Sequence, residues 1–172
     1  MSKSFVLSII SDDRPGIVES LSELLQRHGG NWTESSMLSL AGKFAGILLV
    51  NLPDEESDAF IKGLRVLEES GLQILVQTSG EISPSEGARE FTLDLVGQDH
   101  PGIVHEITEV LADHNINVQE LETHCQGASM SGETLFLAHA RLLIPRDASL
   151  RKLQDSLEDL ANELMVDIKL DE

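Results

Sequence analysis

The sequence predicts an α+β protein made of two copies of one β-α-β-β-α-β unit. The first observation is a repeat, because DDRPGIVESL at 12–21 returns as QDHPGIVHEI at 98–107. Residues 13–34 and 99–120 align without a gap, with ten identities in 22 positions. The second observation is that the segments around this repeat alternate between the periods of a strand and of a helix. Duplication is the simplest account of both.

Each copy opens with a strand, a turn and a helix. Apolar residues alternate with polar ones before the repeated motif, at Phe5, Leu7 and Ile9 in the first copy and at Phe91, Leu93 and Leu95 in the second. This alternation predicts a strand with one buried face. Behind the motif, apolar residues recur at helical spacing over 17–25 and 103–111. His28 with Gly29-Gly30, and His114 with Asn115, are helix-stop signals.

The rest of each copy adds two strands, a helix and a closing strand. The second strand is expected at 31–40 and 117–124, and the third at 44–52 and 134–144. A helix follows at about 55–70 in the first copy and over Leu150 to Leu164 in the second, and the closing strands are 72–78 and 166–170. The second copy carries six extra residues, which we assign to an exposed hairpin loop at 125–132.

This order of elements predicts a ferredoxin-like fold, in which an antiparallel four-stranded sheet carries both helices on one face. The domains are 1–79 and 90–172, and the Ser-, Gly- and Glu-rich segment 80–89 is the linker. A domain of about 80 residues leaves a sheet face and sheet edges in need of cover. We therefore expect the two copies to pack on one another.

Composition restricts the classes of function. The formal net charge is −18, with 30 acidic and 12 basic residues, which disfavours direct contact with nucleic acid or an anionic membrane. No run of apolar residues is long enough to cross a bilayer. The N-terminal segment does not have the layout of a signal peptide, and the lone Cys125 suits a reducing compartment. We expect a soluble cytoplasmic protein.

Common catalytic and metal-binding signatures are missing from the sequence. Five of the six histidines lie at or after position 100, but none has the spacing to Cys or carboxylate that a zinc site requires. No nucleophile motif or phosphate loop is present. We predict a protein that is not an enzyme and that has no catalytic residues, no metal and no cofactor.

The repeated Asp-x-Pro-Gly turn admits two interpretations. It can simply start a helix, with Pro15 and Pro101 in the first turn and Asp13 and Asp99 capping the amides. Alternatively, a glycine amide left uncovered at a helix N-terminus can receive a small carboxylate. Asn31 and Asn117 recur at the start of the second strand and offer donors and an acceptor to an amino acid, or serve the turn backbone instead.

These motifs resemble the ACT domain, a βαββαβ regulatory module whose usual ligands are amino acids. The resemblance is carried by the Asp-x-Pro-Gly-Ile-Val turn, the amphipathic helix and the INV triplet at 116–118. An acidic chain of two such modules is similar to the glycine cleavage system transcriptional repressor family. That similarity implies glycine as the suspected effector and a LysR-type transcription activator as the protein partner.

The resemblance implies effector sites where the turn after the first strand of one module meets a neighbouring module. The candidate ligand-binding residues are Asp13, Arg14, Gly16, Ile17 and Asn31 in the first copy, and Asp99, His100, Gly102, Ile103 and Asn117 in the second. Gly30 and Trp32 replace the aliphatic pair of the second copy, which makes the second site the stronger candidate.

We therefore expect an amino-acid-sensing regulatory protein, homo-oligomeric, that acts by protein contact. The acidic runs 53–58 and 154–163 are either solvated helix faces or surfaces for a basic protein partner. Two alternatives stay open: a sensor that acts on a metabolic enzyme, and a structural interaction protein whose turns bind nothing.

Overall fold

The computed structural model describes residues 1–80, 87–128, 130 and 132–172. These residues form two compact units, one on each side of the segment 81–86. Most of the linker expected at 80–89 therefore lies outside the described residues. Each unit has its own hydrophobic core.

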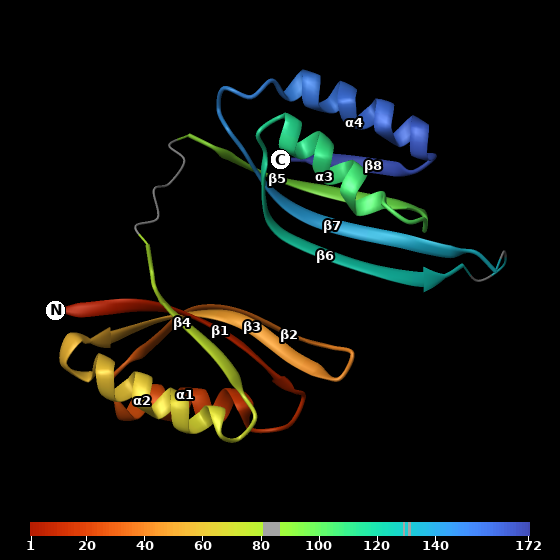
Figure 1. Cartoon of the computed structure of the whole chain (residues 1–172). Helices are drawn as coiled ribbons and strands as arrows, with labels where there is room; N and C mark the ends of the chain where they lie inside the picture. The colour runs from red at the N-terminus through yellow and green to blue at the C-terminus, as the bar shows by residue number, and fades with distance from the viewer. Residues whose placement is uncertain (81–86, 129, 131) are drawn as a thin grey trace. The chain divides into compact units, whose positions relative to one another are not determined.

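The first unit has the predicted order of elements. It consists of β1 (Ser2–Asp12), α1 (Ile17–Arg27), β2 (Asn31–Leu40), β3 (Lys43–Pro53), a 3-10 turn (Asp54–Glu56), α2 (Ser57–Glu68) and β4 (Gln73–Thr78). The sheet order is β2-β3-β1-β4, and all neighbouring strands are antiparallel. Both helices cover one face of the sheet and leave the other open (Figure 1).

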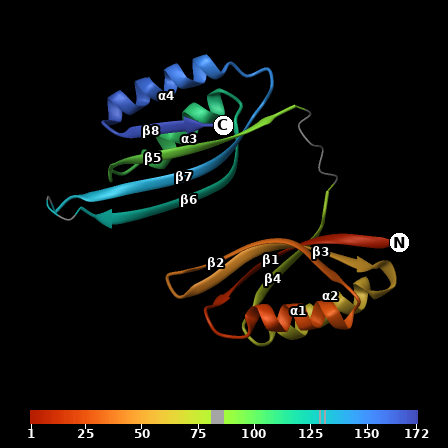
Figure 2. The same cartoon turned by 180° about the vertical axis from the view of Figure 1, so that it is seen from behind.

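The second unit repeats this arrangement. Its elements are β5 (Arg89–Gln98), α3 (Ile103–Asp113), β6 (Asn117–Gly127), β7 (Thr134–Ile144), α4 (Leu150–Leu164) and β8 (Asp167–Asp171). The antiparallel sheet has the order β6-β7-β5-β8, and α3 and α4 again lie on one face (Figure 2). The predicted fold class, two ferredoxin-like α+β domains with four-stranded antiparallel sheets, is confirmed.

The alternating apolar residues of the sequence face the helices and form the two cores. Phe5, Leu7 and Ile9 of β1 are buried against Leu21 and Leu25 of α1 and the apolar face of α2. The second unit buries the equivalent residues of β5, α3 and α4. Burying this apolar area against one face of each sheet is the main stabilising contribution.

Two elements differ from their expected bounds by more than one residue. The segment expected to be one helix at 55–70 divides into a 3-10 turn and α2, which ends before Gly71 at φ +100°. Strand β6 continues through Cys125 to Gly127, which pairs with Thr134, so three residues assigned to the hairpin loop belong to the sheet. Positions 129 and 131 of that loop lie outside the described residues. No helix in the described part of the chain is long and apolar enough to cross a membrane.

Candidate functional site

A left-handed glycine starts the first helix of each unit. Gly16 has φ +92° and Gly102 has φ +95°, and each is the N-cap of its helix. The carbonyl of Gly16 accepts from the amide of Ser20 at 3.0 Å, as that of Gly102 does from Glu106. Residues other than glycine rarely adopt this backbone conformation. The glycine is therefore required by the turn itself, whether or not a ligand approaches.

The space in front of both glycines is open. A Cβ built on Gly16 would meet only Glu19 Oε2, at 3.9 Å, and one built on Gly102 would meet only Glu106 Oε1, also at 3.9 Å. The first amides of a helix have no partner within the helix and point outward there. Each turn thus offers amide donors beside one carboxylate acceptor, a combination that complements the two charges of an amino acid.

The capping role expected of Asp13 and Asp99 is wrong. Neither helix has a side-chain cap, because the N-cap is the glycine three residues beyond the aspartate, and the helix begins one residue later. Pro15 and Pro101 accordingly precede the N-cap instead of standing in the first turn. Asp13 instead accepts a hydrogen bond from Ser39 Oγ at 2.6 Å, and its amide donates to the carbonyl of Gly42 at 2.9 Å. It ties the turn to the β2–β3 hairpin.

The first turn is also tied to the second helix of its unit. Arg14 Nη2 donates to the carbonyl of Ser70 at 2.8 Å and to Ser70 Oγ at 3.1 Å, just beyond the end of α2. A cation is favourable at this end of a helix dipole. Beside the turn, the ammonium of Lys43 hydrogen bonds to the carboxylate of Asp12 and lowers the pKa of Asp12. The Arg14 guanidinium is therefore engaged inside the unit.

In the second turn, the His100 side chain hydrogen bonds to the turn's own strand and helix, and a main-chain bond reaches β7. His100 lies between the carbonyl of Gln98, at 3.4 Å from Nδ1, and Glu106 Oε2, at 3.3 Å from Nε2. The amide of Asp99 donates to the carbonyl of Thr134 at 2.8 Å. His100 is one third exposed, and it holds Glu106 beside the open face of Gly102.

The other candidates divide into buried and distant ones. Ile17 and Ile103 are 4% and 3% exposed and belong to the cores, so only their main chain can meet a ligand. Asn31 pairs in register with Asn51, and Asn51 pairs with Ser4 near the start of β1. The turn, in contrast, follows Asp12 at the other end of β1. Eight residues of strand span roughly 26 Å. Asn31 therefore lies at the opposite end of the sheet from the turn of its own unit.

The second unit has the same separation. Asn117 pairs with Leu143, which pairs with Glu90 near the start of β5, whereas the second turn follows Gln98. Within one unit, the structure brings together the aspartate, the basic residue and the glycine of each turn, and it leaves the asparagine apart. The binding role of these residues stays a prediction.

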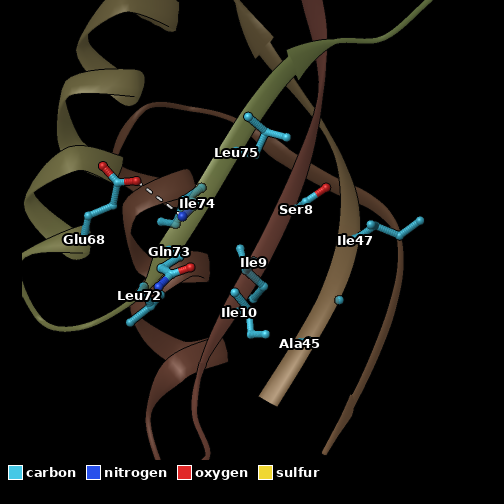
Figure 3. Close-up of a pocket in the computed structure, with 11 residues that line it drawn as sticks. Ser8, Ile9, Ile10, Ala45, Ile47, Glu68, Leu72, Gln73, Ile74 and Leu75 are labelled. Carbon is cyan, nitrogen blue, oxygen red and sulfur yellow. Dashed lines mark hydrogen bonds between the residues drawn. The ribbon is translucent and has the colours of Figure 1, made fainter. Parts of the chain in front are cut away.

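A hollow on the first unit was not predicted from the sequence. It is lined by residues of β1, β3, β4 and the segment before β4, among them Ile10, Ala45, Ile47, Gln73 and Leu75 (Figure 3). None of the ten candidate residues lines it. Glu68 Oε1, one of its polar atoms, already accepts from the amide of Ile74 at 3.3 Å. The walls are mainly apolar, which does not suit a zwitterion.

Two βαββαβ units, each with a glycine turn before its first helix, define a protein of two tandem modules that share one fold. The sequence matches the ACT domain over residues 3–78 and again over residues 91–160. The chain belongs to the ACT-domain family, with two ACT domains in tandem.

Three proteins are similar to the chain in sequence or structure. A UPF0237 protein from Methanopyrus kandleri is 36% identical over 77 residues, which are 42% of this chain and 83% of that protein. The crystal structure of an unknown protein from Galdieria sulphuraria is 34% identical, with a TM-score of 0.88 over 99% of this chain and 98% of its own. The crystal structure of a "putative glycine cleavage system transcriptional repressor" is 18% identical, with a TM-score of 0.72 over 99% of this chain and 97% of its own.

Proposed function

We propose that this chain is a non-enzymatic, cytoplasmic regulatory protein that binds a small amino acid at its Pro-Gly turns, with glycine as the first candidate. The observation that carries the proposal is the open left-handed glycine that begins the first helix of each ACT domain. ACT domains generally bind amino acids, and one structural neighbour that matches 99% of the chain is described as a "putative glycine cleavage system transcriptional repressor".

The second turn is the preferred site. Arg14 of the first turn is engaged with Ser70, and Asp13 with Ser39. In the second turn, His100 contacts only its own strand and helix. A ligand at Gly102 therefore competes with fewer contacts between distant elements than a ligand at Gly16.

A complete site draws on two modules. Because the turn and the asparagine lie at opposite ends of each sheet, they reach one small ligand only if they come from different modules. The second module belongs to the same chain or to another copy in a homo-oligomer. A ligand held in this way favours one arrangement of the modules over others and so changes the surface that a partner meets.

The protein partner that we propose is a transcription activator of the LysR type, controlled by contact in the negative regulation of glycine cleavage genes. The net charge of −18 supports contact with a protein over direct contact with DNA. A gel shift with purified protein and DNA is expected to show no complex. Capture of the purified activator on immobilised protein, with and without glycine, is expected to change with the amino acid.

Titration calorimetry with glycine, serine and the branched-chain amino acids tests the ligand. We expect heat and a rise in the unfolding temperature with at least one of them. Asn117→Ala is expected to weaken binding about tenfold, the loss of one hydrogen bond to a charged group, with an unchanged melting temperature. Asn31→Ala is the matched variant in the first copy.

Each negative result identifies a different alternative. If no amino acid gives heat or a thermal shift, the sensor proposal is wrong and a structural interaction protein is favoured. If binding is present but neither asparagine variant weakens it, these two residues are not in the site. If an amino acid binds and only a metabolic enzyme, not the activator, is captured, the sensor acts on that enzyme.

A further inference from the structure

The open faces of the two sheets differ in chemistry although their strand registers correspond. The open face of a sheet is the one turned away from its helices. One row across the first sheet, from β4 through β1 and β3 to β2, consists of Leu75, Ser8, Ile47 and Ser36. The corresponding row from β8 through β5 and β7 to β6 consists of Lys169, Asp94, His139 and Glu122.

The flanking rows show the same contrast. In the first unit they are Gln77, Val6, Leu49 and Glu34, and Gln73, Ile10, Ala45 and Leu38. In the second they are Asp171, Thr92, Arg141 and Glu120, and Asp167, Val96, Leu137 and His124. The three rows of each sheet comprise twelve positions. In the first sheet one of them, Glu34, is an Asp, Glu, Lys or Arg residue, whereas in the second sheet seven of them are.

The face of the first sheet leaves large apolar side chains in water. Leu75 is 58% exposed, Ile47 55%, Leu38 54% and Ile10 44%. Leu75, Ser8 and Ile47 follow one another across β4, β1 and β3 and line the hollow described above (Figure 3). An apolar patch shared by several strands is typical of a surface that another molecule covers.

Charged side chains on the open face of the second sheet already form ion pairs with one another. His139 Nδ1 and Asp94 Oδ1 are 2.6 Å apart, Lys169 Nζ and Asp171 Oδ2 2.7 Å, and Arg141 Nη2 and Glu120 Oε2 3.4 Å. Removing these charges from water to cover an apolar surface would be unfavourable. This face is therefore a solvated one, and it does not complement the first.

Charge decides which molecule covers the apolar face. With a net charge of −18, two copies of the chain repel one another across most of their surface. The face of the first sheet is the exception, because its three rows are nearly uncharged. Within these three rows a basic partner would find only Glu34, and in the next row Asp12 is already paired with Lys43. The same face of a second copy offers matching apolar rows and adds no buried charge at the centre.

We propose that the open face of the first sheet is a homodimer interface, in which two copies of this chain pack the same faces together. Such an interface is isologous, so Ile47 and Leu75 of both copies lie in it. The inference goes beyond the proposed function and does not depend on the identity of the effector.

Transplanting residues from the second sheet tests the interface. The variant carrying Ile47→His and Leu75→Lys places there the side chains that the second unit has at these positions. Sedimentation equilibrium at micromolar concentration is expected to give a dimer for the wild type and a monomer for this variant. Val66→Lys is the matched control, because Val66 is 63% exposed on α2, on the helical side of the sheet, and the dimer is expected to persist.

A second variant tests the interface in case the double variant fails to fold. Ser36→Glu adds one charge at an exposed position of β2, where the second unit has Glu122, and removes no apolar group. It is expected to weaken the dimer at least tenfold with an unchanged circular dichroism spectrum. A monomeric wild type overturns the proposal. So does a dimer that survives both face variants, or one that Val66→Lys disrupts equally. Calorimetry with amino acids is a separate measurement, so a negative result there would overturn the effector proposal and leave the homodimer proposal unaffected.

Discussion

At the scale of single residues, the glycine of the Pro-Gly turn has a conformational role that stands apart from any ligand. Gly16 and Gly102 have nearly the same left-handed backbone in the two halves of the chain. Space is available for a methyl group at both positions, since the nearest atom would be 3.9 Å away. A substitution there therefore measures backbone strain without steric overlap.

Gly102→Ala is expected to destabilise the second unit by about 1–2 kcal/mol, the cost of placing an L-residue in the left-handed region. Urea unfolding followed by circular dichroism measures it. Gly127→Ala is the matched control, because Gly127 lies in a strand and a Cβ there would meet open space. Equal stability of the two variants would contradict the strained-turn account.

His139 is expected to give the stability a defined pH dependence. Its hydrogen bond to the carboxylate of Asp94, together with that charge and those of Glu122 and Glu120, raises the pKa of His139 above 6.5. A pKa raised in the folded state adds stability that is fully present below the unfolded value and is lost as pH rises through the folded value.

The test of this pH dependence compares the wild type with His139→Gln. The difference in urea midpoint is expected to be largest at about pH 5.5 and to shrink towards about pH 8.5. A difference that grows with pH would contradict the assigned sign. An NMR titration of the His139 ring gives the pKa directly.

At the scale of elements, the repeat and the hydrophobic periodicity were sufficient to predict the eight strands and four α-helices found among the described residues. Strands β2 and β7 and helix α4 have the expected bounds. The capping of α1 and α3 was predicted wrongly because sequence spacing does not show where the N-cap falls. A left-handed Gly16 places the N-cap three residues beyond Asp13, so that α1 begins at Ile17.

The apolar open face was also missed, although the sequence carried a signal for it. In residues 45–52, AGILLVNL, apolar residues occur at both odd-numbered and even-numbered positions and therefore on both faces of the strand. This pattern indicates a strand that is buried on both faces. The equivalent segment of β7 contains His139 and Arg141. The relation between the turns and the asparagines could be placed only through the strand registers.

Helix α4 has the side-chain cap that α1 and α3 lack. Ser149 Oγ accepts from the amide of Lys152 at 3.4 Å. Ser149→Ala is expected to destabilise the second unit by about 0.5–1 kcal/mol, at the low end for a lost N-cap because the bond is long. Ser149→Asp restores an acceptor and is expected to recover most of the loss in the same urea experiment. No loss with alanine would contradict the capping role.

At the scale of the whole molecule, two independent cores imply two independently folding halves. The buried clusters of the units share no residue. Chains of residues 1–80 and 87–172 are expected to unfold cooperatively when expressed separately, since domains of about 80 residues can bury a sufficient core. Thermal unfolding followed by circular dichroism provides the check, and a half without a cooperative transition would show that its core is incomplete.

The duplicated fold has diverged in function between its halves on this account. The first unit carries an Arg14-anchored turn and an apolar sheet face, and the second carries the freer turn and an ion-paired face. We interpret the first unit as the one that associates and the second as the one that senses. Variants of one unit are then expected to alter one property without the other.

The most direct test of the central claim is a titration of the ¹⁵N-labelled protein with glycine, followed by amide NMR shifts. We expect saturable shifts at Gly102 and the following residues of α3, together with an asparagine at the start of β2 or β6. Smaller shifts are expected at Gly16. Unchanged spectra at millimolar glycine and at the same concentration of serine or valine, or shifts confined to the apolar face of the first sheet, would contradict it.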